Sequence, residues 1–154
     1  MRHKDFDLLN QRGAGVSVDM ASALSNFGFV QLRAGQYLDA LTSFSKALPL
    51  WTQLSGFESL RKAITEAGVA ETYEHLGRLT DSAKIFEEVL PVFEQRCGAD
   101  SLRTADILKH YALVLRREGR RDEAKKIEVR AGRIFAEYAV LASNQPIDVL
   151  QLPP

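Results

Sequence analysis

The residue types that could perform acid–base or metal chemistry are few in this chain and are widely spaced. The three histidines, His3, His75 and His110, include no two placed four apart on one helix, which is the spacing that zinc chemistry uses. Glu71 and Glu74 share a helical face, but solvated glutamates commonly do so. The sequence therefore predicts neither a catalytic carboxylate pair nor a metal site.

Nucleophilic and cofactor motifs are also missing from their usual contexts. Ser17 stands outside a Gly-x-Ser-x-Gly elbow. Cys97 is the single cysteine, so the chain can form no internal disulfide and has no cysteine-based metal site. Gly13-Ala14-Gly15 lacks the third glycine of a dinucleotide-binding loop and is interpreted as a linker. We expect no enzyme, no catalytic residue and no cofactor.

Composition narrows the class of partner. Twenty basic and twenty acidic residues cancel over 154 residues, so nucleic acid is not an expected partner. No apolar run is long enough to span a membrane, and the first seven residues mix charges instead of forming a secretory core. We therefore expect a cytoplasmic protein that does not bind membranes.

The elements that must position any functional residue come from an internal repeat with a period of 42. Five positions hold the same residue type three times at this period, which is typical of stacked copies of one supersecondary unit. The five sets are Gln11, Gln53, Gln95; Ser17, Ser59, Ser101; Ala21, Ala63, Ala105; Gly35, Gly77, Gly119; and the aromatics Trp51, Phe93, Phe135.

Each copy predicts two amphipathic helices, because apolar residues recur at steps of three and four. The repeated serine precedes the first helix as a candidate N-cap, and the repeated glycine follows it as a candidate C-terminal cap. Short links make neighbouring helices antiparallel, and the fold class is all-α. The expected helices are 18–33, 37–53, 60–75, 79–95, 102–117 and 121–142.

Two prolines mark the second helix of the first two copies. Pro49 and Pro91 lie one period apart, and each should bend its helix, since proline removes an amide donor and crowds the preceding turn. Arg133 takes this place in the third copy, which predicts a straighter and longer last helix.

The first copy contains the run Leu-Arg-x-Gly-x-Tyr-x-x-Ala (32–40), followed by Phe44, Ala47 and Leu48. With these residues the repeat resembles the tetratricopeptide family. The period of 42, with its Gly-x-x-Ser-Leu-Arg-x-Ala motif at 56–63 and 98–105, is similar to the long-helix subtype of kinesin light chains. The resemblance covers 14–139 and implies an α-solenoid of three helix pairs that binds proteins.

In this family the first helices of the units line a concave groove that holds peptides. The family's carboxylate clamp is missing here, because its places hold Ser25, Phe29, Gly68, Asp106 and His110. Leu113 could bind a partner or pack against a neighbouring helix. The groove residues that the resemblance implies are Asn26, Phe29, Arg33, Glu71, His75, Lys109, His110, Leu113 and Arg117.

The predicted organisation has a short capping helix over 1–13, three repeats over 14–142 (14–55, 56–97 and 98–139) and a flexible tail over 143–154. Residues 6–12 resemble the end of a second helix, so they either cap the first unit or continue a longer array. The tail contains three prolines and no helical periodicity, and an extended conformation is expected for it.

Charge is distributed unevenly between the second and third copies. Residues 56–97 hold five basic and eight acidic residues, whereas 98–139 hold ten basic and seven acidic residues. The basic residues around the last interhelical turn could form a solvated face, dock an acidic segment or drive self-association. The predicted function is a protein-binding scaffold with a peptide in its groove, and the alternative is a self-assembling homo-oligomer. The basic residues are Arg116, Arg117, Arg120, Arg121, Lys125 and Lys126.

Overall fold

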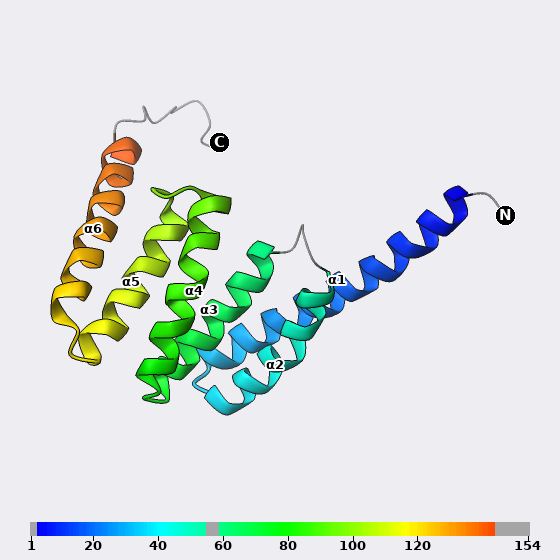
Figure 1. Ribbon diagram of the computed structural model, residues 1–154, viewed down its shortest axis with the longest axis horizontal. Helices are drawn as coiled ribbons and strands as arrows, with labels where there is room; N and C mark the ends of the chain where they lie inside the picture. Colours follow the sequence, from blue (N-terminus) through cyan, green and yellow to red (C-terminus); the bar gives the residue numbers. More distant parts are fainter. Residues whose placement is uncertain (1–2, 55–58, 144–154) are drawn as a thin grey trace, which may run out of the picture.

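Three antiparallel helix pairs stack side by side in this protein (Figure 1). The structure, a computed structural model, describes residues 3–54 and 59–143, with side chains from residue 18 onward. The described part forms an all-α solenoid without strands, as the sequence predicts. The helices are α1 His3–Arg33, α2 Tyr37–Gln53, α3 Ser59–His75, α4 Leu79–Cys97, α5 Leu102–Arg117 and α6 Arg121–Ser143.

The first helix is longer than the sequence predicts. α1 runs without a break from His3 to Arg33, so the prediction of a separate short helix over 1–13 and a linker at 13–15 is wrong. Glycine inside a helix costs only about 1 kcal/mol relative to alanine, and no proline interrupts this segment. The first part of α1 projects away from the stacked pairs (Figure 1). The tail over 144–154 and the unit boundary at 55–56 lie outside the described residues.

Glycine ends the first helix of every pair in the same way. Gly35, Gly77 and Gly119 have φ angles of 75°, 76° and 86°, a left-handed conformation that glycine adopts without a steric penalty. In the first copy the Gly35 amide donates to the carbonyl of Leu32, and the Gln36 amide donates to that of Gln31. The same two bonds recur at the other glycines, so the predicted C-terminal caps are confirmed as Schellman motifs.

The repeated serine does not act alike in the three copies. Ser101 caps α5, since its Oγ accepts from the amide of Thr104 at 3.2 Å. Ser59 is the first residue of α3, and its buried Oγ has no hydrogen-bond partner in the described part of the chain. Ser17 lies inside α1. The predicted N-cap is therefore confirmed only at Ser101, and the predictions at Ser17 and Ser59 are wrong.

The core follows the stacked pairs as a row of clusters, as expected of a solenoid. Phe44 of α2, Phe86 of α4 and Ile134 of α6 are fully buried and anchor the three pairs. Helix α1 contacts α3, and α3 contacts α5, so these three first helices form one layer.

The helices continue through Pro49 and Pro91, and the bend at each proline stays a prediction. α6 has 23 residues against 17 in α2 and 19 in α4, which confirms a longer last helix.

Candidate partner-binding groove

Two adjoining pockets lie along the layer of first helices, and together we call them the groove. They share Phe29 of α1, Ile64 of α3 and Arg103 of α5. The first, here the N-terminal pocket, has a volume of about 410 Å³ and the second, the central pocket, about 310 Å³. The N-terminal pocket is further lined by Ser22, Ser25, Asn26, Trp51, Leu60, Arg61 and Thr65, and the central pocket by Arg33, Ala67, Glu71, Phe93, Asp106 and Ile107.

A chain of hydrogen bonds forms the floor of the N-terminal pocket. Trp51 Nε1 donates to Ser25 Oγ at 3.0 Å, and Ser25 Oγ lies 2.8 Å from Thr65 Oγ1. The Thr65 hydroxyl donates its single proton to the carbonyl of Arg61 at 2.9 Å. Ser25 is therefore the donor in its hydrogen bond with Thr65. The chain links α2, α1 and α3 through buried groups and fixes the shape of this floor.

Two arginines give the N-terminal pocket a positive charge. Arg61 donates to Ser22 Oγ at 3.1 Å, and its guanidinium lies 5.9 Å from the centre of the Trp51 ring. Arg103 is exposed and has no hydrogen-bond or ion-pair partner among the residues the structure describes. Among the residues that the structure describes, the lining of this pocket includes no acidic side chain. Its chemistry suits a ligand with an apolar part for Phe29 and an anion for the guanidinium groups.

The central pocket is balanced in charge. Its described lining includes two arginines, Arg33 and Arg103, and two acidic residues, Glu71 and Asp106. Burial raises the pKa of Glu71, while the nearby His110 and Arg33 act in the opposite direction. The groove therefore changes along its length from a cationic, aromatic end to a mixed-charge end.

The structure brings together four of the nine residues predicted for the groove. Asn26 and Phe29 line the N-terminal pocket, and Phe29, Arg33 and Glu71 line the central pocket. The other five, His75, Lys109, His110, Leu113 and Arg117, lie outside the linings of both pockets.

Those five residues have varied surroundings. His75 stacks on Tyr37 with ring centres 4.8 Å apart, and His110 stacks on Phe86 at 6.3 Å. Arg117 donates to the carboxylate of Glu74, a buried residue, at 3.1 Å. Lys109 is exposed on α5, and so is Leu113, with 44% of its surface accessible. Their part in partner binding stays a prediction.

The sequence prediction missed Arg61, Arg103 and Trp51 as pocket residues. Arg61 and Arg103 lie one repeat period apart, so they occupy the same position of the repeat, just after the start of a first helix. The signal available in the sequence was the arginine that both copies of the Gly-x-x-Ser-Leu-Arg-x-Ala motif contain. The groove residues predicted from the resemblance do not include this position.

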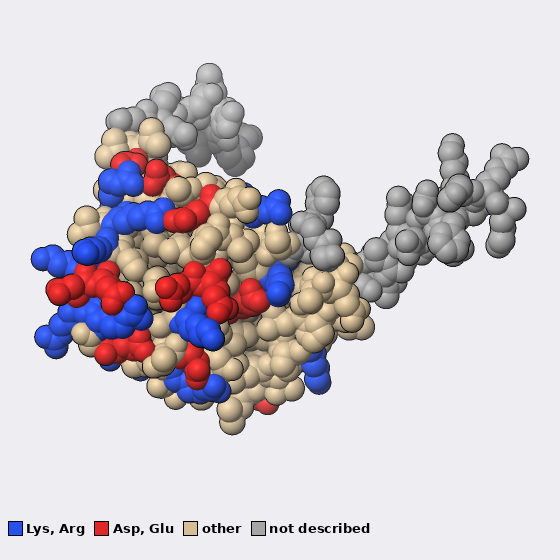
Figure 2. Space-filling model, viewed as in Figure 1, with Lys and Arg blue, Asp and Glu red and all other residues tan. Residues whose placement is uncertain are grey.

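Some of the basic residues of the third copy form ion pairs within the described part of the chain. Arg116 pairs with Glu128, and Arg120 pairs with Glu123 at 2.6 Å and Glu118 at 3.5 Å. On the face shown in Figure 2, acidic and basic side chains mix over α5 and α6, while the coloured surface over α2 and the end of α1 is mostly uncharged. Arg121, Lys125 and Lys126 at the same turn are exposed and form no ion pair with the described residues, so a solvated face and a dock for an acidic segment both stay predictions.

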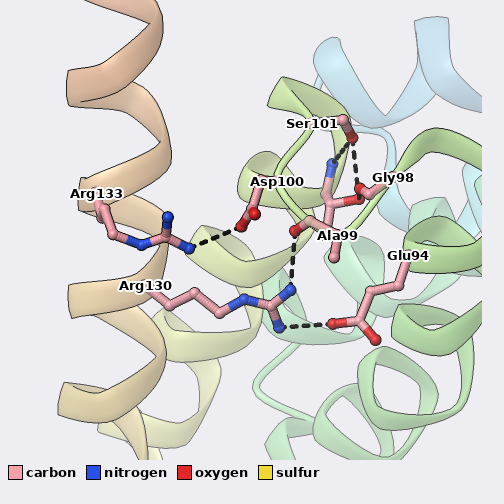
Figure 3. Close-up of polar contacts among 8 residues, drawn as sticks. Glu94, Gly98, Ala99, Asp100, Ser101, Arg130 and Arg133 are labelled. Atoms are coloured by element: carbon pink, nitrogen blue, oxygen red, sulfur yellow. Dashed lines mark hydrogen bonds and ion pairs between the residues drawn. The ribbon is translucent and has the colours of Figure 1, made fainter.

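Two further arginines join α6 to the turn between α4 and α5 (Figure 3). Arg130 donates to Glu94 at 2.6 Å and to the carbonyl of Ala99 at 2.8 Å. Arg133 donates to Asp100 at 2.7 Å. The bonds hold this turn against the last helix, next to the capped start of α5.

Comparison with known families agrees with this architecture. A family model described as tetratricopeptide repeat matches residues 61–136, from the first turns of α3 into α6. The match supports membership of the tetratricopeptide family, whose repeats generally mediate contacts between proteins and are generally not enzymes. No curated protein matches the chain.

The described residues contain no cluster of histidine, cysteine and acidic side chains that could hold a metal ion. Within the same residues, no helix is both long and apolar enough to cross a membrane.

Proposed function

We propose that this chain is a non-catalytic scaffold that holds an extended segment of another protein in its groove. The observation that carries the proposal is the N-terminal pocket, which is lined by the aromatic side chains of Phe29 and Trp51 and by the guanidinium groups of Arg61 and Arg103. A pocket whose floor is fixed by hydrogen bonds loses little conformational freedom when it binds.

The partner segment carries a carboxylate beside a large apolar side chain. The apolar group fills the space beside Phe29 and Ile64, and the carboxylate accepts from Arg61 and Arg103. Charge-assisted hydrogen bonds of this kind stabilise a complex by about 1.5–3 kcal/mol. This proposal places the acidic part of the partner in the groove, whereas the sequence left open a dock at the basic turn of the third copy.

The central pocket extends the same site. A segment leaving the N-terminal pocket passes Arg33 and Glu71 and then meets α5, where the predicted residues Lys109, His110, Leu113 and Arg117 lie. The mixed charges there favour a segment whose own charges alternate.

The proposal includes the long-helix subtype of the family and a cytoplasmic location. Support for the subtype comes from the glycine caps at Gly35, Gly77 and Gly119, which recur at the period of 42, whereas the common form of the repeat has a period of about 34. The location rests on composition alone.

The test is a selection of peptides from a random library by the full chain, followed by binding measured with fluorescence anisotropy. Enriched peptides should contain an acidic residue close to a large apolar one. Arg103→Ala should weaken their binding at least tenfold, because a charge-assisted bond is lost. Arg121→Ala is the matched control, since Arg121 is exposed on α6 and lines neither pocket. Equal losses in both variants would overturn the site.

A further inference from the structure

The outward face of α1 carries large apolar side chains that nothing in the described chain covers. Met20, Phe27 and Val30 expose 54%, 55% and 63% of their surface, and Ala23 between them is also exposed. The steps of three and four place these four residues on one helical face, which we call the N-terminal edge. Apolar faces of this kind mark interaction sites in soluble proteins.

The repeat shows what this face does elsewhere in the molecule. The positions equivalent to Ala23, Phe27 and Val30, one and two periods further along, belong to the first helices α3 and α5, which contact the preceding repeat, and there they are buried. The N-terminal edge is therefore the stacking face of a repeat, left without a neighbour. The buried counterparts of Ala23, Phe27 and Val30 are Thr65, Val69 and Thr72 in α3 and Ile107, Tyr111 and Val114 in α5.

The opposite end of the array does not complement the N-terminal edge. The position of Phe44 and Phe86, which receives the next repeat, holds Glu128 in the last copy, and Glu128 pairs with Arg116. Stacking one chain on the end of another would press Phe27 against this ion pair and desolvate its charges, which is unfavourable. The last helix also exposes Val129, Phe135 and Tyr138, so the ion pair at position 128, and not a polar outer face, is what disfavours this stacking. Head-to-tail assembly is thus disfavoured.

A second N-terminal edge is a better complement. Two identical apolar faces cover each other when a two-fold axis relates them, and the two helices lie antiparallel when that axis is perpendicular to them. Asp19 and Arg33 flank the two ends of the edge, and both are exposed. With Phe27 of one copy opposite Ala23 of the other, Asp19 lies beside Arg33 of the second copy, and the symmetry makes this contact twice.

We propose that two copies of this chain associate through their N-terminal edges, with their α1 helices antiparallel about a two-fold axis. Asn26 and Phe29 point from α1 into the groove instead of along the edge, so the groove stays open in the dimer. The dimer does not depend on the proposed peptide binding. Only Arg33, which lines the central pocket, takes part in both.

The first experiment is sedimentation equilibrium of the full chain over a wide range of concentrations. The wild type should form a dimer, and Phe27→Glu should weaken the association by at least tenfold while the helical circular dichroism stays unchanged. Val129→Glu is the matched control, because Val129 is a helical residue of α6 with 66% exposure outside the edge. A wild type that is monomeric at every concentration, or equal losses in the two variants, would overturn the proposal.

A charge exchange tests the antiparallel geometry. Asp19→Arg and Arg33→Asp should each weaken the dimer several-fold, and the double variant should recover most of the loss. A double variant weaker than both single variants would overturn the pairing. Because Phe27→Glu leaves the groove unchanged, its monomer should keep the affinity of the wild type for the selected peptides. Failure of the dimer and failure of groove binding are therefore separate results.

Discussion

The two junctions between neighbouring repeats fill the same space with different residues. At the first junction, the Phe44 ring packs so closely on Gly28 and Gly68 that a Cβ at either glycine would lie 2.6 or 2.7 Å from it. Phe29 meets the same ring edge-on, with centres 5.0 Å apart. At the second junction, Phe86 takes the place of Phe44, and Ala70 takes the place of Gly28.

The second aromatic ring comes from opposite sides at the two junctions. Position 29 in α1 is phenylalanine and its counterpart is Glu71, whereas position 68 in α3 is glycine and its counterpart is His110. His110 stacks on Phe86 from the helix after it, while Phe29 packs on Phe44 from the helix before it. Packing density is thus preserved by exchanging which helix supplies the ring.

This exchange also sets the character of the groove. Phe29 lines both pockets while it packs on Phe44, so the first junction gives the groove an apolar wall. The second junction contributes Glu71 to the central pocket instead. The change from an apolar to a charged groove follows from how each junction is packed.

Removing the central ring of either junction should have the largest effect. Phe44 and Phe86 are both fully buried, and truncation to alanine should lower the free energy of unfolding by about 3–5 kcal/mol in each case. Phe44→Ala should cost at least as much as Phe86→Ala, because glycine neighbours cannot fill the cavity. Urea unfolding followed by circular dichroism measures both values. A loss below about 1 kcal/mol at Phe44 would contradict this packing.

Adding one methyl group at the first junction should have the next largest effect. In Gly68→Ala the new Cβ would lie 2.7 Å from Phe44 and 2.8 Å from Phe29, so a net loss of about 1–3 kcal/mol is expected. Gly132→Ala is the matched control within α6, because its Cβ would meet no atom within 4 Å. That variant should gain about 0.5–1 kcal/mol from helix propensity. A gain at both glycines would mean that the first junction has room for the methyl group.

The starts of the two helices that follow the junctions offer a smaller contrast. Ser101→Ala should cost about 1 kcal/mol, because the Thr104 amide loses its acceptor. Ser59→Ala should change stability by only a few tenths of a kcal/mol, since the Ser59 Oγ has no partner in the described part of the chain. Thermal unfolding of the two variants side by side measures this difference. Equal losses would indicate that Ser59 caps α3 in solution.

The sequence was sufficient for most of the fold. Apolar periodicity placed α2 and α5 at their observed bounds, and the repeated glycines marked the Schellman caps. The start of α1 was missed because Gly13 and Gly15 are typical of a linker but can also continue a helix at modest cost. Three serines at one repeat position suggested three caps, yet capping depends on where the helix begins. Only Ser101 stands just before its helix.

The site was less accessible from sequence because it depends on contacts between repeats. Helical phase placed Phe29 and Glu71 in the groove from their own helix alone. Arg61 and Arg103 lie nearer the helix starts, and their place in the N-terminal pocket depends on how α3 and α5 stack on α1. The partners of Arg116 and Arg117 are on α6 and α3, so sequence could not separate paired from available arginines in the basic turn.

The smallest expected effect on stability comes from replacing Glu71, the charged counterpart of Phe29. Burial raises its pKa above the ordinary value of 4.5, Asp106 and Glu74 add to the shift, and His110 and Arg33 oppose it. Because these influences partly cancel, the net shift is modest.

The sign of the resulting pH dependence follows from linkage. A carboxyl group with a raised pKa in the folded state binds its proton more tightly there than in the unfolded chain, so it stabilises the fold at low pH. That contribution is complete below the pKa of the unfolded chain and is lost as the pH rises through the raised value in the fold. Glu71→Gln removes this dependence, so the variant should gain stability relative to the wild type as the pH rises above the ordinary pKa of 4.5. Urea unfolding at several pH values measures the gain, with Glu87→Gln on the exposed face of α4 as the control. If the stability of Glu71→Gln relative to the wild type falls as the pH rises, Arg33 and His110 outweigh burial. The second junction would then stabilise the Glu71 carboxylate at the position where the first junction has the Phe29 ring.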